Sequence, residues 1–318
     1  MKLPPGLRPL LIFLVVLAIV AIAAGFFLDP HRRHHPFVRT VVIYASQDQV
    51  YAEPILKEFE RETGIKVLAV YDSESVKTVG LVNRLIAEKE RPQCDIFWNN
   101  EEMRTRQLAA MGVFEKWAPA GHRSRRMAVN TNKLSLAAAP RSLTELTNET
   151  WRGKVALAYP LFGTTAAHFL ALRQSWGDEH WQTWCRALAA NKPFLVDGNS
   201  VSAKLVAKGE AWVGLTDSDD IAAEQREGGP IVPLPLRAES LLIPNTVAVV
   251  RGARHPEAGE KLYAYLQQPD VLEKLVAAHA LESVSPTNMS KGTLKPNWHR
   301  LVTDLETGTS ELKQIFLR

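Results

Sequence analysis

The chain has 318 residues, of which 46% are hydrophobic and 23% are charged, so it holds enough apolar material for about two globular domains. Its formal net charge of +4 is concentrated at the start, because residues 1–33 carry four basic side chains against one acidic one. The rest of the chain is nearly balanced in charge. Composition therefore gives no argument for nucleic-acid binding, and we expect no nucleic-acid partner.

The N-terminal segment, residues 1–36, is predicted to be a signal or a membrane anchor. Leu10–Leu28 is an uncharged run of nineteen residues that follows two basic side chains. At a rise of about 1.5 Å per residue, a helix of this length comes close to the roughly 30 Å hydrocarbon core of a bilayer. We favour an uncleaved anchor over a cleaved signal peptide, although Ala21-Ile22-Ala23 could serve as a cleavage site. The positive-inside rule then predicts a periplasmic or otherwise extracytoplasmic protein, tethered to the inner membrane through residues 10–28.

The next part of the chain alternates strand-like and helix-like segments. The strand-like segments are short runs rich in β-branched and aromatic residues, and the helix-like segments space apolar residues three and four apart. We expect strands at 38–44, 65–70 and 95–98, each followed by a helix, at about 50–63, 76–89 and 103–111. This alternation favours an α/β fold with a parallel sheet and helices on its faces.

The same alternation returns further along. We expect strands at 125–130, 155–159, 211–215 and 241–250, and helices from 166, at 178–191, up to 208, from about 221 and within 257–279, with a last segment at 302–316. The strands near 125–130 and 241–250 are the expected crossovers between two halves of the fold.

Clusters of polar residues lie at several of the predicted strand-to-helix junctions. Their members are Ser46, Gln47 and Asp48; Asn99, Asn100 and Glu101; Gly163, Thr164 and Thr165; Asn199 and Ser200; and Asp217, Asp219 and Asp220. One such junction is explained by helix capping, and capping remains an alternative for each residue taken alone. Five in one chain suggest a common ligand-binding crevice, since ligands of open α/β sheets lie beyond the carboxyl ends of the strands.

The acidic stretch within Gly209–Asp220, GEAWVGLTDSDD, is the densest of these clusters. Its three carboxylates repel one another unless a cation, backbone amides or a hydroxyl-rich ligand offsets them. The alternative is that the aspartates cap the following helix and are solvated.

Several segments, in their order, give the chain a family resemblance. They are VVIYASQDQ, FERETGIKV, DIFWNNEE, GKVALAYP with FGTT, GEAWVGLTDSDD, NTVAVVRGARHPEAGEKLYAYL and VSPTN, within roughly residues 38–290. This set resembles the extracellular solute-binding proteins of ABC transporters, and within them the bacterial ferric-iron-binding group. The resemblance implies a type II periplasmic-binding-protein fold of two lobes joined by hinge strands. The first lobe would comprise residues 37–130 and 242–318, and the second residues 131–241.

The resemblance also implies positions for ligands. Iron-binding members carry a histidine, a glutamate and a tyrosine pair where this chain has Asp48, Asn100 beside Glu101, and Asp219-Asp220. The missing tyrosine pair argues against ferric iron. The acidic set that remains, with Asp48, Glu101, Asp217 and Asp219 as possible metal ligands, suits a hard cation, and a sugar or polyamine would also be accepted. No resident cofactor is expected beyond a possible bound metal ion.

We therefore expect a protein that captures a metal ion or small polar solute between two lobes and delivers it to an ABC-transporter permease. A membrane-tethered sensing receptor and a metal-dependent enzyme are the alternatives. The sequence shows no catalytic motif, which argues against an enzyme. His122 and His168 are expected to be structural, and Cys94 and Cys185 to be buried free thiols in different lobes.

Overall fold

The computed structural model describes residues 39–72, 79–285 and 292–317. The predicted anchor, residues 1–36 with the apolar run 10–28, lies outside these ranges. Among the described residues no helix is both long and apolar enough to cross a bilayer. Residues 39–318 form one compact unit, and its sheet is a mixed one in the order β2-β1-β3-β9-β4-β7-β5-β6, with β8 also paired to β4.

The first lobe contains the predicted strand–helix alternation. Its elements are β1 (Thr40–Ala45), α2 (Gln49–Thr63), β2 (Lys66–Tyr71), α3 (Val79–Ala87), β3 (Ile96–Asn99), α4 (Glu102–Ala110), β9 (Leu242–Val250), α9 (Pro256–Tyr265) and α10 (Pro269–Ala277). Strand β1 runs parallel to β2 and β3, whereas β9 is antiparallel to β3. Two apolar clusters cover the two faces, one with α2, α9 and α10 and the other with α3 and α4. The parallel βαβ prediction is confirmed.

The second lobe repeats this construction on a smaller sheet. Its elements are β5 (Val155–Ala158), α5 (Gly163–Trp176), α6 (Asp178–Ala190), β6 (Phe194–Val196), α7 (Asn199–Lys208), β7 (Val213–Asp217), α8 (Ser218–Arg226) and β8 (Ile231–Leu234), with short 3₁₀ turns at Thr144–Thr147, Glu149–Trp151 and Arg237–Glu239. Strand β5 is parallel to both β6 and β7. The carboxyl ends of these three strands therefore lie at one edge of the sheet.

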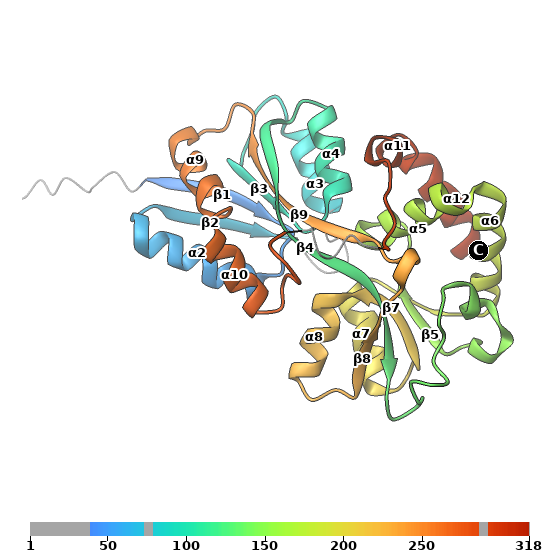
Figure 1. Cartoon of the computed structure of the whole chain (residues 1–318). Helices are drawn as coiled ribbons and strands as arrows, with labels where there is room; N and C mark the ends of the chain where they lie inside the picture. Colours follow the sequence, from blue (N-terminus) through green and yellow to red (C-terminus); the bar gives the residue numbers. More distant parts are fainter. Residues whose placement is uncertain (1–38, 73–78, 286–291, 318) are drawn as a thin grey trace, which may run out of the picture. The chain divides into compact units, whose positions relative to one another are not determined.

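Strand β4 (Phe114–Asn130) connects the two lobes (Figure 1). It is much longer than the predicted 125–130. Up to Ser124 it pairs with β9, and from Arg125 onward it pairs with β7 and then β8. The change of partner lies at residues 124–125, so the first-lobe pairing ends about six residues before the predicted boundary at 130. Strand β9 is reached from the second lobe next to this point, where the Arg125 amide donates to the Leu241 carbonyl at 2.9 Å.

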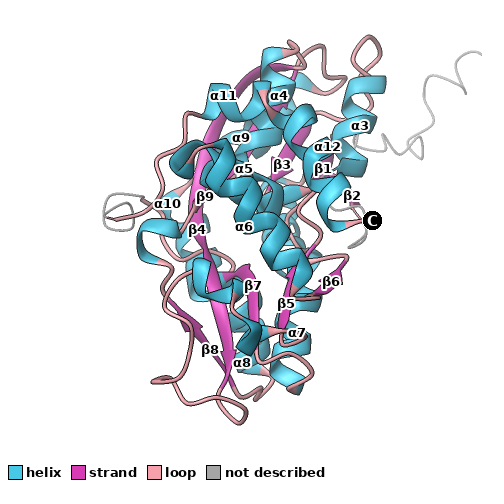
Figure 2. Cartoon of the chain, turned by 90° about the vertical axis from the view of Figure 1, so that its right-hand side faces the viewer, coloured by secondary structure: helices cyan, strands magenta, loops and turns pink. Residues whose placement is uncertain are grey.

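The C-terminal helices depart from the predicted lobe division. Helices α11 (Trp298–Thr303) and α12 (Leu305–Phe316) follow the first-lobe helices in sequence, yet their apolar side chains belong to the core of the second lobe. The ring of Phe316 meets that of Phe169 at 5.9 Å between centroids. Helix α11 also contacts α4, as Figure 2 shows. Helix α12 buries its apolar stripe against α5 and α6 of the second lobe, whereas the predicted division placed all of 242–318 in the first lobe.

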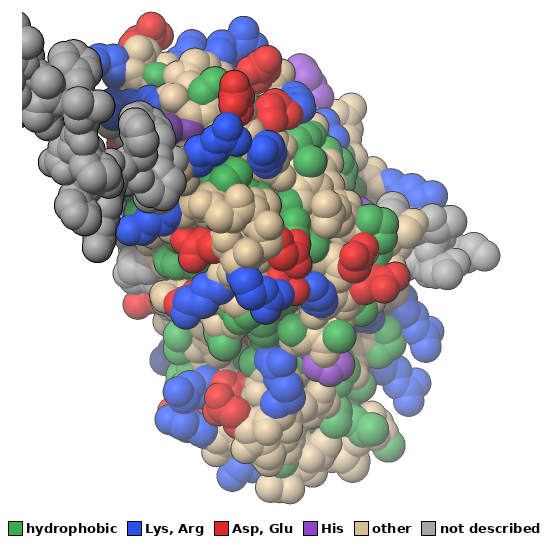
Figure 3. Space-filling model, turned by 90° about the vertical axis from the view of Figure 1, so that its left-hand side faces the viewer, with side chains coloured by type: hydrophobic (Ala, Val, Ile, Leu, Met, Phe, Trp, Pro, Cys, Tyr) green, Lys and Arg blue, Asp and Glu red, His purple; other side chains and the backbone are tan. Residues whose placement is uncertain are grey.

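The two cysteines behave as expected. Cys94 and Cys185 are free and buried, and they lie in separate apolar clusters. Burial raises the pKa of both thiols. On the face drawn in Figure 3, basic and acidic side chains are interspersed rather than gathered by sign.

Candidate functional site

Three helices of the second lobe begin beside one small cavity. Helix α5 follows β5, α7 follows β6 and α8 follows β7, so all three helix N-termini meet at the carboxyl edge of the sheet. The cavity has a volume of about 50 Å³. It is lined by Asn100, Arg123, Ala158, Tyr159, Phe162, Gly163, Thr164, Thr165, Asp197, Gly198, Asn199, Asp217 and Asp220.

Asp217 is the centre of a buried hydrogen-bond network. The Arg125 Nη1 donates to Asp217 Oδ1 at 2.6 Å, and the Thr164 hydroxyl donates to Oδ2 at 2.8 Å. The Asn199 amide bonds the Thr164 hydroxyl at 2.8 Å and reaches Asp217 Oδ2 at 3.3 Å. Arg125 and Asp217 are 0% and 1% exposed, so this is a fully desolvated ion pair held by additional polar groups.

Arg123 forms a second link in the network. Its Nη1 lies 2.6 Å from Asp219 Oδ2 and 3.3 Å from Asp217 Oδ2, and its Nη2 donates to the Asn100 carbonyl at 3.0 Å. The side chain therefore joins the start of α8 to the end of β3. Its Nε is buried and has no hydrogen-bond partner among the described residues.

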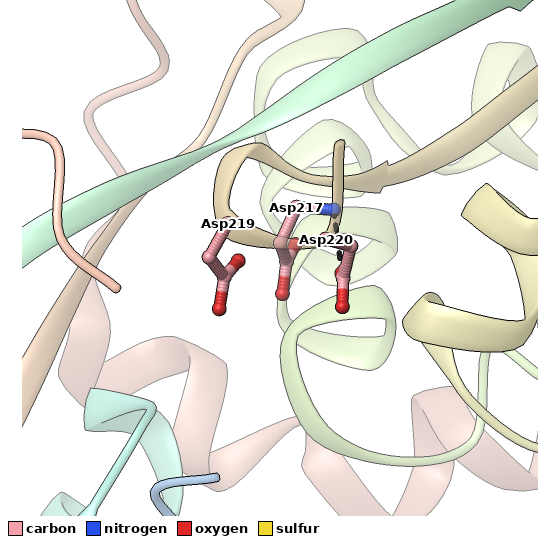
Figure 4. A group of neighbouring side chains, drawn as sticks. All are labelled: Asp217, Asp219 and Asp220. Atoms are coloured by element: carbon pink, nitrogen blue, oxygen red, sulfur yellow. Dashed lines mark hydrogen bonds between the residues drawn. The ribbon is translucent and has the colours of Figure 1, made fainter. Parts of the chain in front are cut away.

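Asp220 serves both as a cap and as a cavity wall. Its Oδ2 accepts from the Thr216 hydroxyl at 2.9 Å and from the Asp217 amide at 3.3 Å. Figure 4 shows the side chains of Asp217, Asp219 and Asp220 projecting from the start of α8 to the same side. The capping and site interpretations of this stretch are therefore not exclusive.

The charges of the network are set by burial and by the two arginines. Burial alone would raise the pKa of Asp217, but Arg125 and Arg123 hold it below its usual value. His168 is also buried, and burial together with Arg125 lowers its pKa to about 3. Its Nε2 lies 2.6 Å from the Glu239 carbonyl. His168 is thus a neutral structural residue near physiological pH and adds no charge to the site.

Helices α5 and α7 begin without side-chain caps. Their N-cap residues are Phe162 and Gly198, and neither offers a side-chain acceptor. The first backbone N–H groups of a helix have no intrahelical acceptor, and the helix dipole makes that end favourable for an anion. Both uncapped ends line the cavity. Thr164 and Thr165 lie inside α5 and bond Asp217 and Asn199 instead of capping the helix.

The polar junctions of the first lobe are used mainly for local structure. The Gln47 side chain accepts from Asn245 at 2.7 Å, and the Asn99 amide donates to the Glu101 carbonyl at 2.6 Å. Glu101 is the N-cap of α4, where its carboxylate accepts from the Arg104 amide at 3.0 Å. Burial raises the pKa of Glu101 to about 7. Of the first-lobe junctions, only Asn100 lines the cavity.

Comparison with known proteins assigns this chain to a family. A family model described as bacterial extracellular solute-binding protein matches residues 40–279. The chain belongs to this family. The major ferric iron-binding protein of Neisseria meningitidis is 22% identical over 291 residues, which cover 82% of this chain and 86% of that protein.

Solved structures of this solute-binding class share the fold. Iron-bound HitA from Pseudomonas aeruginosa is similar with a TM-score of 0.73 and 19% identity, covering 87% of this chain and 99% of that one. AfuA from Actinobacillus pleuropneumoniae, solved with exogenous fructose-6-phosphate bound, gives a TM-score of 0.76 at 19% identity, covering 87% and 98%. The family match thus makes the protein an extracellular solute-binding protein, and its relatives and fold are those of solute-binding proteins rather than of enzymes. The two neighbours hold different ligands, so likeness of fold does not choose between them.

The cavity of this solute-binding protein brings together half of the predicted residues. Those that line it are Asn100, Gly163, Thr164, Thr165, Asn199, Asp217 and Asp220, whereas Ser46, Gln47, Asp48, Asn99, Glu101, Ser200 and Asp219 do not. Sequence reasoning missed Arg123 and Arg125. The signal was present, because HRSRR at 122–126 places these two arginines on one face of a strand with period two.

The predicted metal set is not assembled. Within the described ranges, Asp217, Asp219 and Asp220 offer ligand atoms that lie within 4.8 Å of one another, and Asp48 and Glu101 do not belong to this group. Two of these three carboxylates already hold guanidinium groups at 2.6 Å. The acidic stretch therefore has internal counter-charges that its sequence did not reveal.

Proposed function

We propose that this solute-binding protein captures a small solute with an oxyanion group in the second-lobe cavity, without a metal ion, and delivers it to an ABC-transporter permease. The observation that carries the proposal is the convergence of two uncapped helix N-termini and Arg123 on one cavity. Backbone N–H groups and a guanidinium are the donors that proteins commonly use for phosphate and carboxylate groups.

The size of the cavity supports an oxyanion. Its volume is about 50 Å³, and a water molecule needs roughly 10–15 Å³ on the same measure. The space therefore suits a group of roughly four oxygen-sized atoms, as in a phosphate or phosphonate. The buried Nε of Arg123 offers a further donor to such a group.

The arrangement of the aspartates supports a metal-free site. A multivalent cation bound by Asp217 and Asp219 would lie next to the Arg123 guanidinium, which is 2.6 Å from one carboxylate and 3.3 Å from the other. Repulsion between the two cations would oppose binding unless Arg123 moved away. AfuA has a similar fold and was solved with fructose-6-phosphate bound, so a protein of this fold can bind a phosphate ester.

Capture and delivery follow from the two-lobed fold. Strands β4 and β9 cross between the lobes side by side, which allows a hinge motion that encloses a ligand. The permease is implied by the family, and attachment through residues 10–28 remains a prediction from the apolar run. A tether would keep the binding protein close to its permease and raise its effective concentration there.

Binding measured by calorimetry tests the proposal. The full chain, purified in detergent and treated with EDTA, should bind fructose 6-phosphate or inorganic phosphate. Arg123→Gln and Thr165→Val should each weaken binding by about tenfold or more, because a lost hydrogen bond to a charged group costs about 1.5–3 kcal/mol. Thr303→Val, on α11 away from the cavity, is the matched control and should bind like the wild type. Binding of Fe(III) with no response to any phosphate compound would overturn the proposal.

A further inference from the structure

A short segment after α10, residues 281–283, lies along the strand that connects the lobes. The His122 amide of β4 donates to the Ser283 carbonyl at 2.8 Å, and the Glu282 amide donates to the His122 carbonyl at 2.8 Å. Leu281, at the start of the segment, is buried in the core of the first lobe. This segment, called the hinge strap below, is therefore fixed to the first lobe.

The Glu282 carboxylate contacts β4 on both sides of the point where that strand changes partner. Its Oε2 accepts from the Ser124 hydroxyl at 2.8 Å, and Ser124 pairs with β9 of the first lobe. Its Oε1 accepts from Nη2 of Arg126 at 3.0 Å and from Nε at 3.2 Å, and Arg126 pairs with β7 of the second lobe. The Ser124 contact thus lies within the first lobe, whereas the Arg126 contact crosses the hinge point.

Alternate residues of β4 contact the cavity network and the hinge strap. Successive side chains of a strand point to opposite faces. Arg123 and Arg125 bond aspartates of the cavity network, whereas Ser124 and Arg126 bond Glu282 on the other face. The contacts of Glu282 therefore act on the same stretch of backbone that carries the two arginines of the site.

The lobes are separated by a groove beside this contact. The groove has a volume of about 640 Å³ and is lined by Ile221 and Pro233 of the second lobe and by Val276 and Leu281 of the first. Because a groove is not a packed interface, rotation of the lobes about the hinge can widen or narrow it. An ion pair at its edge limits that rotation, and Glu282 forms such a pair.

We infer that Glu282 is a positioning residue for ligand capture. The hinge strap and Ser124 hold its carboxylate in the first lobe, and through Arg126 it keeps the second lobe at the angle at which Asn100 lines the cavity with the second-lobe helix ends. Without the pair, the ligand-free protein spreads over a wider range of lobe angles. The apparent affinity for any ligand then falls with the fraction of molecules in which the cavity is assembled.

Distances between nitroxide labels on the two lobes test the inference without a ligand. The labels are attached to Leu68→Cys in the first lobe and Leu136→Cys in the second, both exposed positions, while the two native cysteines are buried. Double electron–electron resonance on the full chain in detergent gives the distribution of distances. Glu282→Lys should broaden or shift this distribution, because it places a positive charge beside Arg126. Glu282→Gln keeps an oxygen for Ser124 and should have the same effect to a smaller extent.

Two further variants separate the hinge contact from a general effect of charge. Arg126→Glu combined with Glu282→Lys restores an ion pair of reversed sign and should return the wild-type distribution. Glu58→Lys changes a carboxylate of matched exposure, 22% against 23%, which pairs with Lys274 inside the first lobe. It should leave the distribution unchanged.

Three results of the label measurement would overturn the inference. They are an unchanged distribution in Glu282→Lys, an equal change in Glu58→Lys, and a double variant that remains broadened. Because these distances are measured without a ligand, the result holds whether or not the proposed function fails.

Calorimetry with fructose 6-phosphate and inorganic phosphate separates positioning from direct contact. Glu282→Gln should weaken the binding of both compounds by the same factor, about twofold to fivefold, as expected for the loss of a half-exposed ion pair. Unequal factors would place Glu282 among the residues that contact the ligand and would overturn the positioning role.

Discussion

The two lobes use the polar residues at their strand-to-helix junctions differently. Each lobe has parallel strands that end in polar residues before a helix begins. In the first lobe these residues bond groups of that lobe: Glu101 caps α4, and Gln47 accepts from Asn245. In the second lobe they turn to one another and enclose a cavity, with Asp217 bonded by Thr164 and by Arg125 from a neighbouring strand.

This difference teaches that a polar strand end is not by itself a binding site. The second lobe differs because β4 contributes Arg123 and Arg125 to the edge where three helices begin. These arginines supply counter-charges beside aspartates that are buried close together. Arg123 also reaches a first-lobe junction, where it donates to the Asn100 carbonyl.

The largest effect should come from removing Arg125. Arg125→Ala leaves Asp217 buried without its main counter-charge, and we expect the free energy of unfolding to fall by about 3–5 kcal/mol. Chemical denaturation followed by tryptophan fluorescence measures it. Arg126→Ala is the matched control, since Arg126 is 29% exposed and pairs with Glu282, so its loss should cost about 1 kcal/mol or less. Equal losses would show that the second-lobe network is not special.

The free energy of unfolding should depend on pH through Glu101 of the first lobe. The folded protein holds the pKa of Glu101 at about 7, above its ordinary value of 4.5, so the folded state binds its proton more tightly than the unfolded state. Stability from this group is complete below about pH 4.5, declines as pH rises towards 7, and is lost above it, by roughly 3 kcal/mol in total.

Glu101→Gln tests the source of that effect. The amide keeps an oxygen for the Arg104 cap but carries no charge, so the variant should be more stable than the wild type at pH 8. Denaturation curves at pH 5, 6, 7 and 8 measure the difference. A wild-type slope that persists in the variant would assign the pH dependence to another group.

The sequence predicted the elements better than the way they are joined. The strand–helix alternation of the first lobe was readable because β1 and α2 each carry a clear apolar pattern. The length of β4 was not, because EKWAPAGHRSRR lacks the apolar runs that mark a strand and owes its pairing to β9. The packing of α12 on the second-lobe core could not be predicted either, since an amphipathic pattern does not indicate which core a helix covers.

Only half of the predicted site residues line the cavity, and strand pairing that the sequence does not show is again the reason. Thr164, Asn199 and Asp217 were found because each lies at the junction of a strand and the next helix, and these junctions meet at one sheet edge. Arg125 was missed because it lies within a strand, and its role depends on the pairing of β4 with β7. Glu101 was assigned to the ligand although local capping uses it first.

A smaller effect should separate ligand binding from folding. Thr164→Val removes the hydroxyl that bonds Asp217 and should cost about 1–3 kcal/mol in stability while weakening ligand binding. Thr105→Val removes a buried hydroxyl that lies 2.7 Å from Thr246 in the first lobe and should cost a similar amount while leaving binding intact. Calorimetry and denaturation on both variants make the comparison. A loss of binding in Thr105→Val would contradict the assignment of the site to the second lobe.

The smallest effect concerns a contact from α8 to first-lobe helices. Arg226 donates to the Tyr51 hydroxyl at 2.5 Å and to the Ala278 carbonyl at 2.7 Å. Because Arg226 is exposed, we expect Arg226→Ala to weaken ligand affinity by about twofold to fivefold, mainly through faster dissociation. Stopped-flow dissociation rates measure the change. An unchanged rate would mean that this contact does not help to hold the lobes together.

The most direct test is a crystal structure of the full chain with fructose 6-phosphate in EDTA, with anomalous data collected at the iron edge. We predict a phosphate between the first turns of α5 and α7, within hydrogen-bond distance of Arg123, with Arg123 still paired to Asp219. A metal peak among Asp217, Asp219 and Asp220, with Arg123 displaced, would contradict the account.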